Sequence, residues 1–540
     1  MTAERYDTKW WGWGPTAHRS ELSPDALELL RSELGATEDT PPVALEAVRL
    51  PEPRPLPDAV RRAAGEGDVL TSAEDRLRRA AGRSYPDLIR LRSGALEDAP
   101  DAVLVPTNAD AVAALLAACA NERVAVVPFG GGTSVVGGLD PYRGGFERLV
   151  SLDLQRMRDV EVDRRSLTAR LGPGLRGPEA EAALGAAGVT LGHFPQSFEY
   201  ATVGGFAATR SAGQASSGYG RFDAVVTSLR LVTPAGELGT LETPHSAAGP
   251  ALRELVLGSE GIFGVITEVG VRVRPRPVAR RYEAWMAADF ASGLEITRAL
   301  AQGEAPPDIV RLSDREETRL SLAMSATRGI ARRAFDAYLR ARRRDDGCIL
   351  IAGWEGERES VARRRALAAR TIRLGDAAYL GQAPGRAWER GRYEGPFLRD
   401  ELLDHGLMVE TLETSHTWSR LGELYGAVRD AIASALDAQG TPGLVLCHVS
   451  HLYPDGASLY YTFMARRRAG AEIEQWRAVK TAACDAIVAT GGTITHHHAV
   501  GRDHVPYMRA EVGELGLETL RAVKQRLDPV GIMNPGKLVD

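Results

Sequence analysis

Three consecutive histidines, His496, His497 and His498, have side chains suited to proton transfer. An imidazole titrates near neutral pH and can donate or accept a hydrogen bond at either nitrogen, which also suits stabilisation of an anion. The triplet follows a Gly-Gly pair and a Thr-Ile-Thr stretch that favours a β-strand. In a continuing strand, His496 and His498 would point to one face and His497 to the other. All three can therefore serve one site only if the backbone bends, and we expect a bend near Gly501.

Two other interpretations of the triplet stay open. His496 and His498 could bind a metal ion with a further histidine, since imidazole is a common ligand of zinc, copper and iron. The further ligand would be His448, His451 or His504. The sequence near the triplet offers no carboxylate or cysteine at ligand spacing, so we predict no metal. The histidines could also be hydrogen-bonded core residues, an interpretation that is weaker for three in a row than for one.

Tyr460 lies in the strand-like sequence ASLYYTF at residues 457–463. Side chains alternate between the two faces of a strand, so Leu459, Tyr461 and Phe463 should share one face and Tyr460 should take the other. By itself such a tyrosine is more typical of a core than of a catalytic site. Tyr460 is the candidate and Tyr461 is the alternative.

Arg311 and Arg399 are each set among apolar neighbours, in the sequences IVRL and FLR. A buried guanidinium needs a partner, and its planar fork can bind a phosphate or a carboxylate through two hydrogen bonds. The partner could be a ligand anion or an internal acid such as Asp400, and both remain open.

A second kind of site is indicated by a glycine-rich loop. Residues 128–138 read PFGGGTSVVGG and follow an apolar stretch at residues 124–127. Glycines this dense let backbone N–H groups turn toward one anion, which is typical of a cradle for phosphate oxygens. A Walker loop would need Lys-Ser or Lys-Thr after its last glycine, and a Rossmann fingerprint would need its glycines to open a helix. Neither pattern is present, so we expect a pyrophosphate cradle of another type.

Two later segments also combine small residues with glycines. Residues 194–213 read FPQSFEYATVGGFAATRSAG, and residues 258–266 read GSEGIFGVI. Small residues allow a flat ring system to approach the backbone closely. Three such loops, separated by β-rich runs, suit a long dinucleotide. Together they resemble the flavin-binding fold of the vanillyl-alcohol oxidase family.

Further motifs resemble the alkyldihydroxyacetonephosphate synthase branch of that family. They are KWWGWG at 9–14, IVRLSD at 309–314, FLRD at 397–400, ETLET at 410–414, SLYY at 458–461, THHH at 495–498 and DPVGIMNPGK at 528–537. The flavin loops and the NPGK ending are shared by many flavin oxidases, whereas the histidine triplet with Tyr460, Arg311 and Arg399 is more specific. Thr411 and Leu412 depart from the branch, which carries a serine and an aromatic residue there.

The resemblance spans nearly the whole chain and implies an α+β protein, with a two-part FAD-binding domain and an inserted α+β cap domain for the substrate. It implies noncovalent FAD and an exchange of the acyl group of acyl-dihydroxyacetone phosphate for a fatty alcohol, through a flavin N5 adduct. Tyr460, assisted by His497 or His498, would abstract a proton. Arg399 would lie at the substrate, and Arg311 would hold the phosphate or face the flavin. The partners would be these lipids and a second copy of the chain in a homodimer.

The implied flavin-binding residues all come from the three loops. They are Pro128, Gly130, Gly131, Gly132, Thr133, Ser134, Gly137, Gly138, Pro195, Ser197, Thr202, Gly204, Gly205, Thr209, Ser211, Gly213, Glu260, Gly261, Gly264 and Ile266. The main rival function is an FAD-dependent oxidoreductase of a 2-hydroxy acid or alcohol, in which the arginines would hold a carboxylate. A flavin-binding sensor without enzyme activity is a third alternative.

Composition excludes several other classes of protein. The chain has 540 residues, 44% of them hydrophobic and 25% charged, and its net charge of −5 does not favour binding of nucleic acid. Four widely spaced cysteines suit a reducing compartment, and no apolar run reaches the roughly 18 residues of a membrane span. We expect a bacterial cytoplasmic protein. Arginine-rich stretches at 331–344 and 362–373 are typical of solvated helix faces, and peripheral contact with the inner face of a membrane stays open.

A chain of this length should contain several domains, because domains cluster at about 100 to 150 residues. We expect an N-terminal segment at 1–97 with a helix over 72–91, an FAD-binding domain at 98–277, and a cap domain at 278–482. Residues 483–540 should return to the FAD-binding domain and carry the histidine triplet. Within the second part, a strand at 102–105, a helix capped by Asn108 and a strand at 124–127 should lead into the glycine-rich loop.

Overall fold

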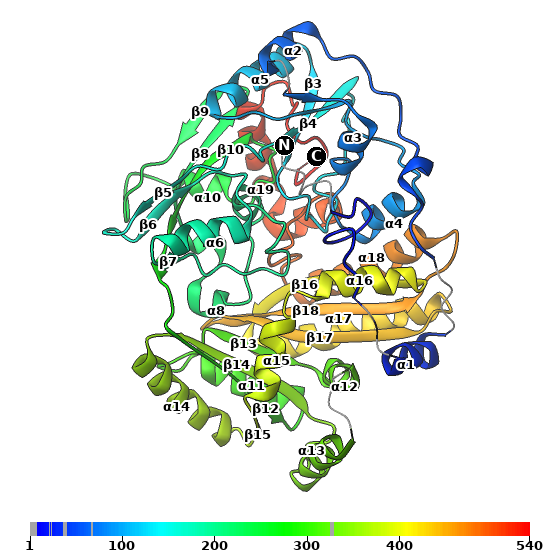
Figure 1. The fold of residues 1–540 in the computed structure, drawn as a ribbon, viewed down its shortest axis with the longest axis vertical. Helices are drawn as coiled ribbons and strands as arrows, with labels where there is room; N and C mark the ends of the chain where they lie inside the picture. The colour runs from blue at the N-terminus through cyan, green and yellow to red at the C-terminus, as the bar shows by residue number, and fades with distance from the viewer. Residues whose placement is uncertain are drawn as a thin grey trace.

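The chain is described here by a computed structural model, which covers residues 8–20, 22, 24–35, 40–65, 68–324 and 329–539. It has two lobes, shown one above the other in Figure 1. The upper lobe contains a four-stranded and a five-stranded sheet, and the lower lobe is built on a seven-stranded sheet. The C-terminal segment lies in the upper lobe, as expected.

The four-stranded sheet of the upper lobe positions the first glycine loop. Its strand order is β1 (Val69–Leu70), β2 (Ala102–Leu104), β4 (Arg148–Asp153) and β3 (Val124–Phe129). The predicted strand–helix–strand unit is confirmed, since α5 (Ala109–Asn121) joins β2 to β3, and the Asn108 side chain accepts a hydrogen bond from the Ala111 N–H. α2 (Asp58–Ala64) packs on α5, and residues of both helices share one core with this sheet.

The five-stranded sheet carries the other two loops. It is antiparallel in the order β5 (Val160–Asp163), β6 (Thr168–Leu171), β10 (Val265–Arg272), β8 (Val226–Thr233) and β9 (Gly236–Gly239). Around it lie α6 (Gly177–Ala186), α7 (Val203–Ala208), α8 (Ser216–Tyr219), α9 (Phe222–Val225), α10 (Leu252–Val256) and the ribbon of β7 (Val189–Thr190) with β11 (Arg274–Pro275). The chain leaves for the lower lobe directly after β11.

The lower lobe is the expected cap. Its antiparallel sheet has the order β15 (Ala378–Gly381), β12 (Ala279–Ala287), β14 (Cys348–Gly356), β13 (Ile309–Ser313), β17 (Gly443–Leu452), β18 (Gly456–Arg466) and β16 (Leu407–Thr417). One face packs on α11 (Phe290–Ala301), α14 (Arg358–Leu374), α17 (Trp418–Ala438) and α18 (Glu472–Thr490). The predicted alternation of β18 is confirmed: Leu459, Tyr461 and Phe463 lie in that core, and Tyr460 takes the other face.

The remaining helices lie in both lobes. They are α1 (Pro24–Leu34), the short 3-10 helix Leu45–Ala47, α3 (Ala73–Arg78), α4 (Tyr85–Ser93), α12 (Arg315–Met324), α13 (Gly329–Ala341), α15 (Ala383–Gly391), α16 (Gly395–Asp404), the 3-10 helix Val505–Tyr507 and α19 (Met508–Leu527). Of these, α19 packs in the core of the five-stranded sheet and α3 contacts β2, whereas α1, α12, α13, α15 and α16 contact the cap sheet. Among the described helices, none is both long and apolar enough to cross a membrane.

Three expected boundaries differ from the structure. The single helix expected over 72–91 is two helices, α3 and α4, because α3 ends at the C-cap Arg79 and Ser84 begins a new helix through a capping box with Asp87. The boundary at 97/98 does not hold, since α2 and β1 already belong to the upper lobe. The boundary at 482/483 falls inside α18, whose apolar side continues in the cap core to Ile487.

Candidate active site

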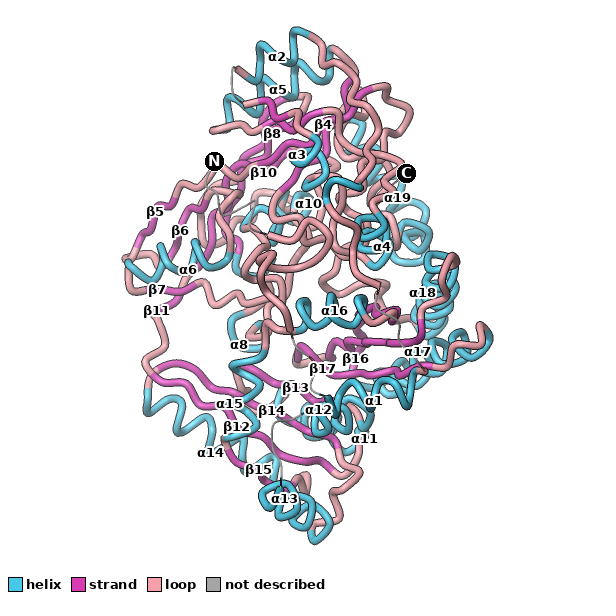
Figure 2. Tube along the Cα trace, turned by 45° about the vertical axis from the view of Figure 1, so that its right-hand side comes forward, coloured by secondary structure: helices cyan, strands magenta, loops and turns pink. Residues whose placement is uncertain are grey.

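One cavity of about 460 Å³ joins the glycine loops to the cap sheet. The loops that contribute to it gather between the sheets of the two lobes (Figure 2). All the expected flavin-binding residues line it except Gly137 and Gly213, and all the expected catalytic residues line it except His496. The tertiary structure therefore brings residues from 128 to 498 to one place.

The glycine loops fit a ligand that approaches the backbone closely. A Cβ at Gly131 would overlap the Tyr200 carbonyl oxygen, and a Cβ at Gly130 would overlap the Thr202 hydroxyl. A Cβ at Gly204 would lie 2.7 Å from the Pro173 Cβ. The first two loops are therefore packed against each other with no room for side chains, and their backbone amides stay near the cavity. This close packing fits the phosphate cradle expected from the glycine-rich sequence.

Asn534, from the NPGK ending, ties these loops together. Its Nδ2 donates to the carbonyl oxygens of Gly138 at 3.2 Å and Glu260 at 2.7 Å. The Glu260 carboxylate accepts the N–H groups of Val500 and Gly501, each at 2.8 Å. Burial raises the pKa of Glu260 to about 7, against the lowering effect of these two hydrogen bonds. Glu260 thus holds the cradle against the segment that follows the histidine triplet.

The strand favoured by the Thr-Ile-Thr sequence does not form, so the histidine triplet does not continue a strand. Residues 491–500 form turns and bends, and the backbone wraps around the Glu413 carboxylate of β16. Glu413 accepts the N–H of His496, the N–H of His497 at 2.9 Å and the N–H of His498 at 2.7 Å. The expected bend is therefore present at the triplet itself, and a buried acid causes it.

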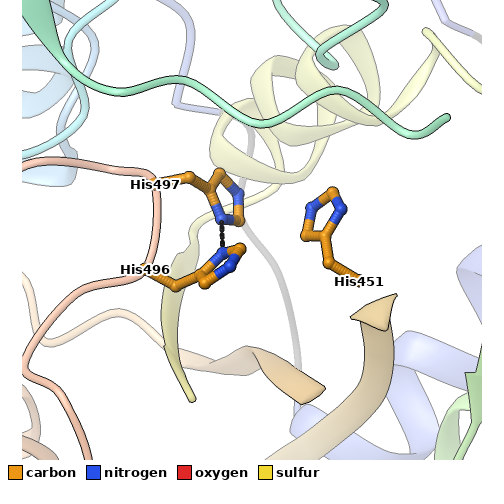
Figure 3. Close-up of side chains that lie close together, drawn as sticks. All are labelled: His451, His496 and His497. Atoms are coloured by element: carbon orange, nitrogen blue, oxygen red, sulfur yellow. Dashed lines mark hydrogen bonds between the residues drawn. The ribbon is translucent and has the colours of Figure 1, made fainter. Parts of the chain in front are cut away.

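The rings of the triplet pack around Tyr460. Its ring stacks between His448, at a centroid distance of 4.9 Å, and His497, at 6.1 Å. His498 meets Tyr460 edge-on at 5.4 Å. His496 does not line the cavity, and its Nδ1 is 2.9 Å from the Nδ1 of His497 (Figure 3). Tyr460, His497 and His498 therefore face the cavity together.

Burial keeps these groups uncharged. It lowers the pKa of His497 and lowers that of His498 to about 3, in spite of the nearby Glu413. Burial raises the pKa of Tyr460 to about 12, although a hydrogen bond with Thr411 acts to lower it. For Glu413, burial acts to raise the pKa, but the imidazoles and the loop N–H groups outweigh it and lower the pKa well below its usual range. Neutral proton carriers thus lie beside the ionised carboxylate of Glu413.

Arg311 has internal partners. It interacts with His448 Nε2 at 3.0 Å and forms an ion pair with Glu317, whose other oxygen is 3.0 Å from His448 Nδ1. Burial alone would raise the pKa of Glu317, but Arg311 and His448 lower it to about 2. This triad fixes Arg311 at the cavity wall and leaves part of its guanidinium for a ligand.

Arg399 pairs with Glu410, not with the neighbouring Asp400, which the sequence had suggested. Its Nη2 is 3.2 Å from Glu410 Oε1, whereas Asp400 binds Lys9 and the N–H of Trp13. Asp400 points away from Arg399 because its contacts with Lys9 and Trp13 join the N-terminal segment to α16. The Nε atom of Arg399 is buried without a hydrogen-bond partner among the described residues, and Arg399 lines the cavity.

The metal set considered as an alternative, His496 and His498 with a third histidine, is not what the structure brings together. In the part of the chain that is described, the nitrogens within 4.8 Å of one another belong to His451, His496 and His497 (Figure 3). Both nitrogens of His496 are already in hydrogen bonds, to His497 and to the Tyr453 hydroxyl at 2.7 Å. A metal would have to displace one of them.

Sequence reasoning missed several residues at this site. Glu413 and Thr411 belong to the ETLET motif but were assigned no role, Glu317 was passed over, and His451 was considered only as a metal ligand. Other side chains at the cavity that received no role are Gln196, Gln214 and Trp388. Glu413 could have been suspected from its place among the buried residues of the strand β16, since a buried carboxylate needs partners.

Comparisons with known proteins agree with this geometry. The family "FAD binding domain" matches residues 100–242, and "FAD linked oxidases, C-terminal domain" matches residues 276–538. An alkyldihydroxyacetonephosphate synthase of Dictyostelium discoideum is 34% identical and is aligned over 93% of this chain and 84% of its own. One from Trypanosoma brucei brucei is 31% identical over 99% and 92%. A solved alkyldihydroxyacetonephosphate synthase superposes with a TM-score of 0.87 at 30% identity, covering 100% of both chains.

Proposed function

Because the chain belongs to the alkyldihydroxyacetonephosphate synthase family of FAD linked oxidases, we propose that it exchanges the acyl group of acyl-dihydroxyacetone phosphate for a fatty alcohol. Its cofactor is FAD, held noncovalently in this proposal. The observation that carries the proposal is one cavity that joins a glycine cradle, neutral proton carriers, arginines and an apolar extension.

Proton transfer is assigned to Tyr460 with His498 and His497. When bound, FAD supplies an electron-accepting ring near these groups. With its pKa raised to about 12, Tyr460 carries a proton at rest and can act as a base only after passing that proton to a neighbour. The neighbour assigned to this role is His498, the ring of the triplet whose centroid is nearest to that of Tyr460, at 5.4 Å.

The phosphate is assigned to Arg399 and Arg311. Each has one carboxylate partner, so each guanidinium keeps donors for a second anion. The unpartnered Nε of Arg399 is such a donor, and an unsatisfied buried donor is costly unless a ligand accepts its hydrogen bond.

The acyl and alkyl chains are assigned to an apolar extension of the cavity. It is formed by α1, α12 and α16 on the outer side of β16, β17 and β18. The side chains shared by this apolar cluster and the cavity wall are Leu22, Leu30, Leu320, Leu402, Val409, Leu446 and Met464, with Met324 and Leu398 packed against them. Burying a chain here removes hydrocarbon from water at roughly 0.8 kcal/mol per methylene group.

The test is product analysis by mass spectrometry after the FAD-loaded protein is incubated with palmitoyl-dihydroxyacetone phosphate and hexadecanol. The expected products are the alkyl ether and free palmitate, with no oxidant consumed. The competing oxidoreductase function predicts instead that a 2-hydroxy acid or an alcohol bleaches the flavin under anaerobic conditions. Bleaching of that kind, without ether formation, would overturn the proposal.

The setting of the reaction is also part of the proposal: a homodimer in the cytoplasm that contacts a membrane peripherally. Support comes from α13 and α14, where Ile330 and Leu374 are exposed beside arginines, a combination that suits an anionic lipid surface. Co-sedimentation with phosphatidylglycerol vesicles should fall when Ile330 and Leu374 are both changed to Asp. For the homodimer, light scattering should give twice the mass of the chain. Equal sedimentation of parent and variant, or a monomer mass, would contradict the respective point.

A further inference from the structure

Tyr453 lies behind the histidine triplet, at the end of a chain of hydrogen bonds that reaches the cavity. Its hydroxyl is 2.7 Å from the Nε2 of His496. The Nδ1 of His496 is 2.9 Å from the Nδ1 of His497, and His497 lines the cavity whereas Tyr453 and His496 do not. Any effect of Tyr453 on the reaction must therefore pass through His496.

Each group in this chain of hydrogen bonds has one hydrogen to donate to the next, so the direction of the first hydrogen bond fixes the direction of the others. The Tyr453 hydroxyl also interacts with the guanidinium of Arg221, which has only donors. The phenol oxygen accepts from Arg221, which leaves its own hydrogen available for His496 Nε2, the acceptor 2.7 Å away, and we infer that it points there. Burial, the main effect on this phenol, raises the pKa of Tyr453 to about 12, so that hydrogen is retained at neutral pH.

The imidazoles of His496 and His497 are neutral, because burial lowers the pKa of both. A neutral imidazole has one N–H group and one acceptor nitrogen. With Nε2 accepting from Tyr453, His496 carries its hydrogen on Nδ1 and donates it to His497 Nδ1. His497 must then carry its own hydrogen on Nε2.

We propose that Tyr453 is a positioning residue, which through His496 sets the tautomer of His497 so that an Nε2–H donor is presented at the cavity beside Tyr460. The inference rests on the proposed function for its catalytic meaning, but the tautomer itself does not depend on any reaction. This tautomer gives the histidines of the triplet different roles. His497 donates a hydrogen bond to a bound group, so proton acceptance falls to His498 and Tyr460.

One contact opposes this arrangement and makes it testable. The Glu413 Oε2 atom is 3.5 Å from His497 Nδ1 and would attract a hydrogen placed there. That distance is long for a hydrogen bond, and the same oxygen already accepts the N–H of His496. The shorter contact with His496 should therefore decide the tautomer.

The test uses the full chain with FAD bound and with 15N-labelled histidine, whose two ring nitrogens have separate shifts when protonated and unprotonated. The signals of His497 are identified as those missing from His497→Gln. In the parent, Nε2 of His497 should be the protonated nitrogen. In Tyr453→Phe, the signals of His497 should move toward a mixture of tautomers.

Activity gives the second readout. Tyr453→Phe should lower kcat about 10- to 100-fold, with KM and FAD content unchanged. Tyr425→Phe is the matched control: it also removes one hydrogen-bonded phenol hydroxyl, which binds Asp314 on the far side of the cap sheet, and should leave both readouts unchanged. A hydrogen on Nδ1 of His497 in the parent, or identical spectra for the parent and Tyr453→Phe, would overturn the inference. If no substrate is turned over but the spectra behave as stated, only the proposed function fails.

Discussion

A single carboxylate, Glu413, determines the shape of the histidine loop. It accepts three successive backbone N–H groups and the Thr495 hydroxyl at 2.8 Å, across more than 80 residues of sequence. Several hydrogen bonds to one ionised oxygen pair are stronger than the same bonds to a neutral acceptor. The loop is thus built around a charge that itself does not face the cavity.

Replacing Glu413 should collapse this arrangement. In Glu413→Gln, the amide NH₂ faces backbone donors, and each unsatisfied buried group costs about 1–3 kcal/mol. We expect a lower unfolding temperature and a 10- to 100-fold loss of kcat, as is typical when a positioning partner is lost. Glu511→Gln is the control, since Glu511 binds Thr493 and Ile494 of the same loop but is exposed. Equal losses in both variants would contradict the special role of Glu413.

His504 gives a prediction about pH. Burial lowers its pKa to about 3, and its Nδ1–H donates to the Ala499 carbonyl at 2.9 Å. In the unfolded chain its pKa is about 6.5, so between these values the unfolded state binds a proton that the folded state does not. Stability is therefore lost as the pH falls below 6.5. In His504→Gln this loss should be smaller by up to about 1.4 kcal/mol per pH unit. Parallel plots of unfolding temperature against pH would refute the assignment.

At the scale of elements, strands position the functional side chains and loops determine the shape of the site. β18 presents Tyr460 to the cavity and its neighbours to the core, because successive side chains alternate. β3 delivers the glycine loop at its end, and residues 532–534 pair beside β3, so the C-terminal segment fixes the same edge. The cradle is rigid because regular elements hold both of its ends.

The close approach of the first two loops predicts the effect of adding one methyl group. Gly131→Ala should place a Cβ against the Tyr200 carbonyl oxygen, forcing the loops apart and lowering FAD content. Gly239→Ala is the matched control, because nothing lies within 4 Å of a Cβ there. The flavin-to-protein absorbance ratio of the purified proteins measures the difference. Full FAD content in Gly131→Ala would mean that the loops do not form the cradle.

At the scale of the whole molecule, the two lobes are joined by a buried polar contact near the cavity. Glu355 of β14 accepts hydrogen bonds from Tyr219 of α8 at 2.8 Å and from Tyr282 of β12. Next to it, the Gly218 N–H donates to the Asp308 carbonyl at 3.1 Å. Because the active site lies between the lobes, this contact helps set the distance between the cradle and the cap.

Removing the Tyr219 hydroxyl should weaken the contact between the two lobes. Tyr219→Phe leaves Glu355 with one fewer donor, at a cost of about 1–3 kcal/mol for a buried acceptor. Proteases should then cut faster near Val278, which is exposed in the connection between the lobes. Tyr338→Phe is the control, since its hydroxyl donates to Tyr379 within the cap. Equal cleavage rates in the two variants would show that the Glu355 contact does not hold the lobes together.

Short-range patterns in the sequence were enough for the class of fold, the cofactor and the face taken by Tyr460. Glycine clusters and strand alternation are properties of neighbouring residues, so they can be recognised without distant partners. The single helix expected over 72–91 was wrong although the signal is local, since Ser84 and Asp87 form the capping box that begins α4. The pairing of Arg399 with Glu410 rather than Asp400, by contrast, depended on where α16 meets β16.

The sequence by itself determined which chemical groups the protein has and on which local elements most of them lie. Only the tertiary structure decided which of them meet: Glu413 with the histidine loop, Arg311 with Glu317, and Tyr453 with His496. The physical reason is that burial and charge pairing act between residues tens or hundreds of positions apart. A buried charge or N–H group selects its partner by position in space, and that position exists only once the lobes have folded and closed.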